Sequence, residues 1–258
     1  MRPVEPHIAL TQVKLPTYKH SMRIALLRVG IDTGFGGIHG PLFKHNSFEF
    51  IPIPDMHNKD ERTYGTIMGR HGRTLVEYFP EPRRSTMRSQ SVHVDPEFST
   101  FTYGDPTTPK ASLRHLQAGD ILAFYSGLEG WDFKAEPALY LIGYFEVMAA
   151  GRATDFSEDE RHDLFAANFH VRHESIYRDQ QDRLVLVKGS ENSRLLGKAY
   201  KISARGFDSA GRPLKVLSPE MQKVFGNFGG RNSIQRSPPR WVDVDHVAVA
   251  AEFIRSLW

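Results

Sequence analysis

The sequence predicts an α+β protein in which a mixed, largely antiparallel sheet carries peripheral helices. Residues 120–127 (DILAFYSG) and 138–147 (ALYLIGYFEV) each read as a strand, and the ten residues between them permit an antiparallel pair. Apolar residues at helical spacing in residues 242–258 predict a closing amphipathic helix. A barrel-like core around the paired strands is a refinement of this prediction.

Composition narrows the class of protein. The chain has 258 residues, and 40% of them are hydrophobic, which is enough to bury a real core. It has no cysteine, which removes disulfides, thiolate metal sites and cysteine nucleophiles and suits a reducing compartment. Its apolar runs are too short to span a bilayer, so we expect a cytoplasmic protein without membrane partners. A net charge of +3 permits contact with nucleic acid without predicting it.

The remaining elements follow along the chain. Residues 1–22 read as an N-terminal arm and residues 23–258 as a single domain. Strands are predicted at residues 24–29, 48–54 and 183–188, and helices at residues 75–79, 110–116, 157–168 and 218–225. Ser157 and Glu160 form a capping box at the third helix, and Pro219 suits the first position of the fourth. Residues 189–204 are predicted to begin as a polar turn and to continue as a short helix or a strand, and both remain open.

Two groups of motifs resemble known families. Residues 119–125 (GDILAFY) with 141–147 (LIGYFEV) resemble a pattern of PUA-like barrels that bind bases. The ensemble RVGIDTGFGGIHGPLF, FEFIPIPD, HVDPEF, TYGD, GDILAFYSGL, LIGYFEV, KGSENSRLLGKAYKIS and QRSPPRW is similar to the nucleotide modification associated domains of bacteria and phages, third class. This second resemblance covers residues 23–241 and implies a role in modifying or handling nucleic-acid bases, without a catalytic assignment.

A glycine-rich loop (residues 30–41) follows the first predicted strand. Gly34, Gly36 and Gly37 let the backbone approach a ligand, and Asp32 and His39 supply polar chemistry, so we interpret both as candidate catalytic residues. The loop lacks the Gly-Lys-Ser/Thr ending of a P-loop and does not match GxGxxG. A tight connection between two strands is the alternative.

The segment HVDPEF contributes the second pair of candidate catalytic residues. His93 and Asp95 share a face if extended, and they suit a general base with an orienting carboxylate or two metal ligands. Turn formation by Asp-Pro is the alternative. No metal is predicted, because no H-x-x-x-H or H-E-x-x-H spacing occurs. His170 and His173 are interpreted as surface or cap residues.

Further residues are candidates for contact with a nucleotide or nucleic acid. An aromatic ring in the loop after residue 127 can stack on a base or plug a barrel end, and polar residues near turns can hold phosphate or only form turns. The candidates are Tyr103, Asp105, Trp131, Lys188, Ser193, Gln235 and Arg236.

Two functions follow as hypotheses. The first is a nucleotide or DNA-base modification protein whose glycine loop and HVDPEF segment form one site. The second is a non-catalytic PUA-like reader of modified or flipped bases, and an interaction module without a pocket is a blander third possibility. The sequence identifies no cofactor, reaction or oligomeric state.

Overall fold

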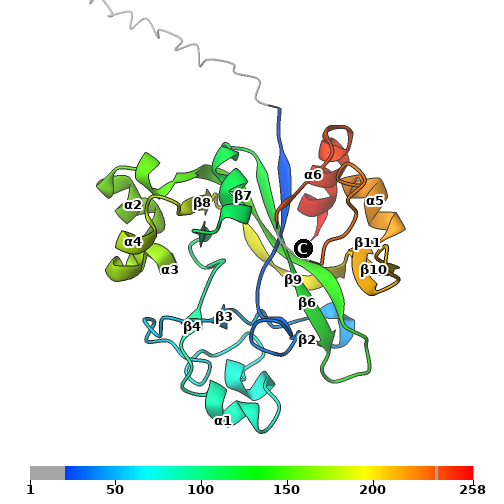
Figure 1. Cartoon of the computed structure of the whole chain (residues 1–258), viewed down its shortest axis with the longest axis horizontal. Coiled ribbons are helices and arrows are strands. Elements are labelled where there is room, and N and C mark those ends of the chain that lie inside the picture. Colours follow the sequence, from blue (N-terminus) through cyan, green and yellow to red (C-terminus); the bar gives the residue numbers. More distant parts are fainter. Residues whose placement is uncertain (1–20, 236–237, 258) are drawn as a thin grey trace, which may run out of the picture.

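The computed structural model describes residues 21–235 and 238–257. The α+β prediction is confirmed: a central sheet, most of whose strand pairs are antiparallel, carries helices on both sides. In Figure 1, α2, α3 and α4 lie on one side of the sheet, and α5 and α6 lie on the other. Most of the predicted arm and Arg236 lie outside the described residues, and the single domain at 23–258 stays a prediction.

Eight strands of the described chain form the main sheet, in which β12-β1-β6-β7-β8-β5 is the order and β2 and β9 pair with β6 and β7. No pairing joins β12 to β5 in this part of the chain, so the sheet is open. The predicted hairpin is confirmed as the antiparallel pair β6–β7, whereas β1 pairs with β6 in parallel. Bounds are β1 Ile24–Arg28, β2 Gly40–Leu42, β5 Thr102–Asp105, β6 Ile121–Gly130, β7 Ala138–Arg152, β8 Val185–Gly189, β9 Arg194–Lys201 and β12 Arg240–Trp241.

Two smaller antiparallel sheets complete the strand set of the described residues. They are β3 (Ile53–Pro54) with β4 (Val92–His93), and β10 (Ser203–Phe207) with β11 (Pro213–Leu217). The predicted strand at 48–54 shrinks to β3, because Pro52 has no N–H to donate to a ladder. Within residues 189–204 the open choice between helix and strand resolves to a strand, since a turn at residues 191–192 leads into β9.

The predicted helices lie where they were expected, but two of them are 3-10 helices and not α-helices. The segments predicted at 75–79 and 110–116 are 3-10 helices, Leu75–Tyr78 and Thr108–His115. At α2 the capping box is confirmed: the Glu160 N–H donates to Ser157 Oγ at 3.2 Å, and the Ser157 N–H donates to Glu160 Oε2 at 2.8 Å. The α-helices are α1 Arg83–Met87, α2 Glu158–Phe165, α3 Phe169–Arg172, α4 Glu174–Gln180, α5 Pro219–Phe225 and α6 Val247–Ser256.

Three hydrophobic clusters stabilise this arrangement. The largest surrounds β6 and β7, where the Phe124 and Phe145 rings meet at 4.7 Å between centroids. A second contains Ile31 of the glycine loop, Tyr64, Phe79 and Val92 of β4, the strand labelled in the lower part of Figure 1. A third packs α2 against β8. The described chain therefore has three packed regions, each with its own hydrophobic cluster.

Candidate functional site

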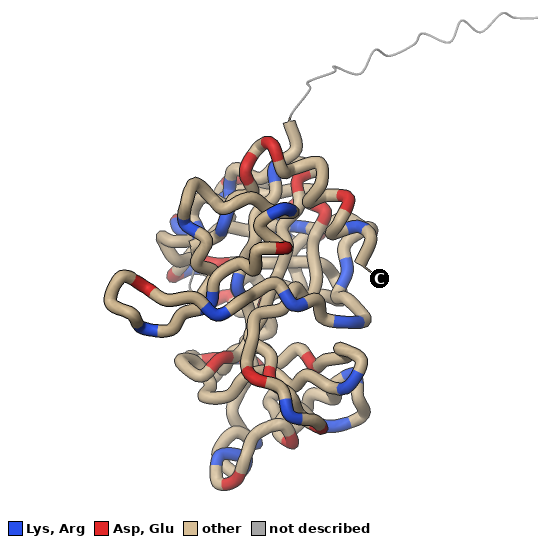
Figure 2. The backbone as a smooth tube through the Cα atoms, turned by 90° about the vertical axis from the view of Figure 1, so that its right-hand side faces the viewer, with Lys and Arg blue, Asp and Glu red and all other residues tan. Residues whose placement is uncertain are grey.

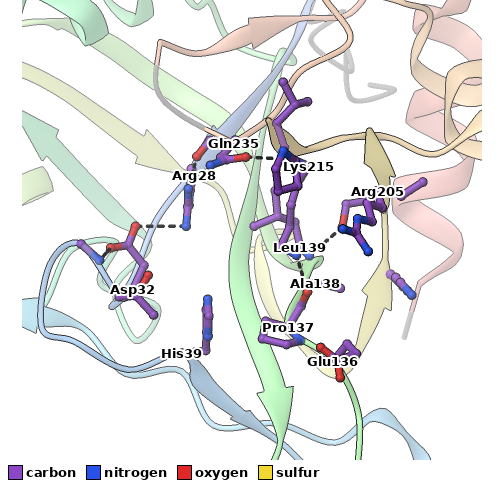
Figure 3. A pocket seen from close by; sticks show the side chains of 17 residues that line it. Arg28, Asp32, His39, Glu136, Pro137, Ala138, Leu139, Arg205, Lys215 and Gln235 are labelled. Carbon is purple, nitrogen blue, oxygen red and sulfur yellow. Dashed lines mark hydrogen bonds and ion pairs between the residues drawn. The ribbon is translucent and has the colours of Figure 1, made fainter. Parts of the chain in front are cut away.

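A cleft of about 980 Å³ opens beside the end of β1. Its walls come from the glycine loop, the start of β7, the end of β9, the β10–β11 hairpin and Gln235. Figure 3 shows these side chains around it. Of the predicted site residues, the cleft collects Asp32, Gly34, His39 and Gln235.

The cleft is positively charged. Arg28, Lys201, Arg205 and Lys215 line it, against the carboxylates of Asp32 and Glu136. Burial lowers the pKa of Lys215, and the nearby charges of Lys201, Arg28 and Arg205 lower it further, against an opposing effect of Glu136. Elsewhere basic and acidic residues are interspersed along the chain (Figure 2), so this concentration of cations is local.

Asp32 organises the glycine loop. Its Oδ1 accepts hydrogen bonds from the Gly34 and Phe35 N–H groups, both at 2.8 Å, which is the short-range turn that Asp favours. Its Oδ2 lies 3.0 Å from Arg28 Nη2, and Arg28 Nη1 donates to the Gln235 carbonyl. Asp32 therefore positions an arginine at the cleft wall, while its predicted catalytic role stays a prediction.

The three glycines of the loop that were predicted to contact a ligand have different surroundings. Gly34 lines the cleft, but a Cβ on Gly36 would lie 2.2 Å from Ile31 Cγ1, and one on Gly37 would lie 1.2 Å from Arg83 Nη1. Gly36 and Gly37 also have φ of 100° and 82°, which L side chains rarely adopt. These two glycines admit packing atoms of the protein and do not line the cleft.

His39 projects into the cleft (Figure 3). Its Nδ1 lies 3.2 Å from Glu129 Oε2, so a carboxylate orients the imidazole. The ring also lies close to β6, where a Cβ on Gly127 would be 3.0 Å from His39 Cδ2. The side chain of Asp32 is held by two backbone N–H groups and by Arg28, whereas the imidazole of His39 has Glu129 as its polar contact.

The other pair of candidate catalytic residues belongs to a separate buried cluster. His93 Nε2 and His170 Nε2 lie 3.9 and 3.7 Å from Asp95 Oδ2. Asp95 Oδ2 also accepts from the Gly104 N–H at 2.8 Å, and Phe169 stacks on the His93 ring with centroids 3.9 Å apart. None of these residues lines the cleft, so the prediction that the glycine loop and HVDPEF share one site has no support here.

Burial dominates the electrostatics of this cluster. It raises the pKa of Asp95 and lowers the pKa of His93 and of His170, because charged groups lose their hydration there. The interpretation of His170 as a surface or cap residue was wrong, since it is 3% exposed. Among the described residues, His93, Asp95 and His170 form the group whose ligand atoms, all within 4.8 Å of one another, could hold a metal ion.

The remaining predicted residues are dispersed. Tyr103 donates to Asp105 Oδ2 at 3.1 Å near the buried cluster, and Asp105 also pairs with a lysine of the following 3-10 helix. Trp131 is 41% exposed and its ring packs edge-on against Tyr78. Lys188 donates to the Thr100 carbonyl. Outside the cleft, these contacts support a structural role for each side chain.

Ser193 and Gln235 differ in their relation to the cleft. The buried Ser193 Oγ accepts from the Glu146 N–H at 3.1 Å, as a turn residue would. Gln235 lines the cleft and its Oε1 accepts from the Lys215 N–H at 2.9 Å. Arg236, the next residue, lies outside the described residues.

The functional residues that sequence reasoning missed fall into two groups. Lys201 and Arg205 are four positions apart in an extended segment. Alternate residues of such a segment share a face, so the sequence could have shown that Lys201, Ser203 and Arg205 point the same way. Lys215 reaches the cleft through the hairpin partner of β10. His170 had no such signal, because only the fold brings α3 against Asp95.

The chain is therefore an α+β protein with an open main sheet. A basic cleft lies beside the end of β1, which pairs in parallel with β6. The chain belongs to the family described as nucleotide modification associated domain 3, whose model matches residues 23–255. No curated protein and no solved structure matches the chain. Within the described residues, no helix has both the length and the apolar character needed to cross a membrane.

Proposed function

We propose that the protein binds a phosphate-bearing nucleotide in the cleft, free or within a nucleic-acid strand, and handles its base for modification. The single observation that carries the proposal is the set of four cations around a cleft of about 980 Å³. That volume lies at the upper end of small-molecule sites, about 300–1,000 Å³. The family supports a role in nucleotide modification.

The phosphate is assigned to the cationic walls. Lys201, Arg205 and Lys215 come from neighbouring extended segments, and Arg28 is held by Asp32 and by the Gln235 carbonyl. Lys215 Nζ donates one hydrogen bond to the Pro137 carbonyl, and an ammonium has three donors, so two remain for a ligand. Arginine and lysine are the side chains that bind phosphate in proteins.

The base is assigned to the less polar wall at the start of β7. Pro137 just before β7, Leu139 on β7 and Leu214 on the facing β11 are apolar residues of this lining, next to Ser203. Apolar side chains with a few polar groups are the usual lining of a base or cofactor pocket. His39 and Glu136 are titratable groups of the cleft lining that could transfer protons to or from a bound base.

Binding of nucleoside 5′-monophosphates and of short single-stranded oligonucleotides, measured by titration, tests the proposal. Lys215→Ala is expected to weaken binding about 10–100-fold, which corresponds to a charge-assisted hydrogen bond of about 1.5–3 kcal/mol. Lys198→Ala is the matched control, because Lys198 is exposed on β9 and does not line the cleft. Equal affinity for nucleosides with and without phosphate, or equal losses in both variants, contradicts the proposal.

A non-catalytic reader is distinguished from a modifying protein by products. Mass spectrometry of nucleosides from cells with and without the protein is expected to show a changed modified nucleoside. Unchanged nucleosides together with tight, phosphate-dependent binding identify a reader instead. His39→Ala separates the two further, because loss of product with retained affinity indicates chemistry and not binding.

A further inference from the structure

We propose that His93, Asp95 and His170 form a binding site for a divalent transition-metal ion. His93 in β4 and Asp95 just after it are near neighbours in the chain, and α3 brings His170 to them only in the folded protein. The site is separate from the cleft, and the proposal does not depend on nucleotide binding.

The strongest argument is the state of the candidate ligand atoms. His93 Nε2, Asp95 Oδ1 and His170 Nε2 are each buried, and none has a hydrogen-bond partner among the described residues. Buried polar atoms in folded proteins are nearly always hydrogen-bonded or coordinated. The side chains of Asp95 and His170 are each only 4% exposed, so solvent does not satisfy them. Each of the three residues thus has a buried polar atom without a partner, and one ligand atom from each lies within 4.8 Å of the others, as in a coordination site.

Neighbouring groups hold the ligands in the required form. His170 Nδ1 lies 2.7 Å from Gln180 Oε1, and an amide oxygen can only accept, so Nδ1 carries the proton and Nε2 presents its lone pair. Asp95 Oδ2 is held by the Gly104 N–H at 2.8 Å and by Asn168 Nδ2 at 3.4 Å. Such outer partners are a general feature of metal-binding histidines and carboxylates.

The spacing suits a small ion after a modest contraction. The two His–Asp separations are 3.9 and 3.7 Å. A tetrahedral ion with bonds of about 2.0–2.2 Å requires ligand atoms about 3.3–3.6 Å apart. The two His–Asp pairs need shifts of a few tenths of an ångström, and the whole set, whose atoms lie within 4.8 Å of one another, contracts by up to about 1.5 Å. Two imidazoles and one carboxylate are a donor set of Zn²⁺ and of non-haem Fe²⁺, with positions left for an exogenous ligand.

Close packing makes this geometry specific. A Cβ on Gly104 would lie 2.8 Å from Asn168 Oδ1 and 2.9 Å from His170 Cδ2, so β5 and α3 approach each other through the absence of a side chain. Phe169 stacks on His93 and keeps its ring in place. The three ligands are thus fixed by their surroundings before an ion binds.

Metal titrations of the full chain, first treated with a chelator, test the proposal. Binding of Co²⁺ is followed by visible absorption, and binding of Zn²⁺, or of Fe²⁺ in the absence of oxygen, is followed by calorimetry. We expect one equivalent per chain in the wild type and none in His170→Ala. His173→Ala is the matched control and is expected to bind normally, because His173 Nε2 faces Asp60 at 3.6 Å instead. Gln180→Ala, which keeps all three ligands, is expected to weaken affinity about 10–100-fold.

X-ray absorption on the Zn²⁺-bound wild type covers the case in which His170→Ala does not fold. Two imidazoles in the first coordination shell support the site, and fewer than two overturn it. The proposal also fails if the wild type binds none of the three ions, or if His170→Ala binds them with unchanged affinity. Lys215→Ala is expected to keep its metal, so failure of the cleft proposal and failure of the metal proposal are distinguishable.

Discussion

Lys215 is the residue through which the charge of the cleft is most directly measurable. Burial and neighbouring cations lower its pKa from the usual 10.5. An anionic phosphate favours the protonated ammonium, so affinity for a nucleoside monophosphate is highest while Lys215 is protonated. We expect that affinity to fall as pH rises through the lowered pKa, at a lower pH than an ordinary lysine would produce.

Titrations from about pH 8 to about pH 10 check this, because the phosphate, with a second pKa of about 6, is almost fully ionised throughout that range. Lys215→Arg is expected to abolish the alkaline decline, since a guanidinium stays protonated there. Lys198→Arg provides the comparison and should leave the decline as in the wild type. A decline that persists in Lys215→Arg would show that another group controls it.

At the same scale, sequence reasoning succeeded only for neighbours. His93 and Asp95 were predicted to act together because alternate residues of an extended segment share a face, and they do converge. Asp32 and His39 were predicted to share a pocket because both belong to the glycine loop, and both line the cleft. His170 lies 75 positions beyond Asp95 (170 minus 95), and no periodicity links residues at that separation.

The central hairpin is the element on which the main core depends. Phe124 on β6 is fully buried, and its ring meets Phe145 at 4.7 Å and Phe98 at 5.6 Å. Phe124→Ala is expected to lower the free energy of unfolding by about 3–5 kcal/mol through lost burial and the cavity left behind. Urea denaturation followed by circular dichroism measures the change.

Phe207 on β10 is the control for that variant. Its side chain is 62% exposed and its ring lies 5.5 Å from the Arg205 guanidinium carbon. Phe207→Ala is therefore expected to cost less than about 1 kcal/mol. Similar losses in both variants would mean that the β6–β7 core does not dominate stability.

Strands that are long and apolar were predictable, and short or polar ones were not. β6 and β7 were predicted because uninterrupted burial demands continuous apolar sequence. The β10–β11 hairpin has mostly half-exposed and exposed residues, so no hydrophobic pattern marks it, although it forms one wall of the cleft. The parallel pairing of β1 with β6 across more than 90 residues has no local signal either.

For the whole molecule, Asp60 joins regions that belong to different cores. Its fully buried carboxylate lies 2.7 Å from Arg62 Nη2, 3.5 Å from Arg172 Nη1 and 3.6 Å from His173 Nε2. Burial raises its pKa, but the hydrogen bonds and charge of Arg62 and the charge of Arg172 outweigh this, so the pKa lies below the usual 3.8. Because the folded-state pKa is depressed, this contribution is present above pH 3.8 and is lost as pH falls.

Asp60→Asn is expected to lower the free energy of unfolding at pH 7 by about 3 kcal/mol, at the low end for a broken buried ion pair because Arg62 and Arg172 retain solvent contact. The variant should also lose less stability than the wild type between about pH 5 and about pH 3. Urea denaturation at each pH measures both. Asp163→Asn is the exposed control, and parallel pH profiles in wild type and Asp60→Asn would contradict the assignment.

The contacts that hold Arg28 have a consequence for the kinetics and the entropy of ligand binding. Arg28 is fixed by Asp32 and the Gln235 carbonyl, and Lys215 is fixed at its N–H by Gln235 and at its ammonium by Pro137. Immobilising a long side chain during association costs about 0.5–1.5 kcal/mol. These two side chains are already ordered, so an anion meets a rigid receptor and its association rate is set by diffusion and charge rather than by rearrangement.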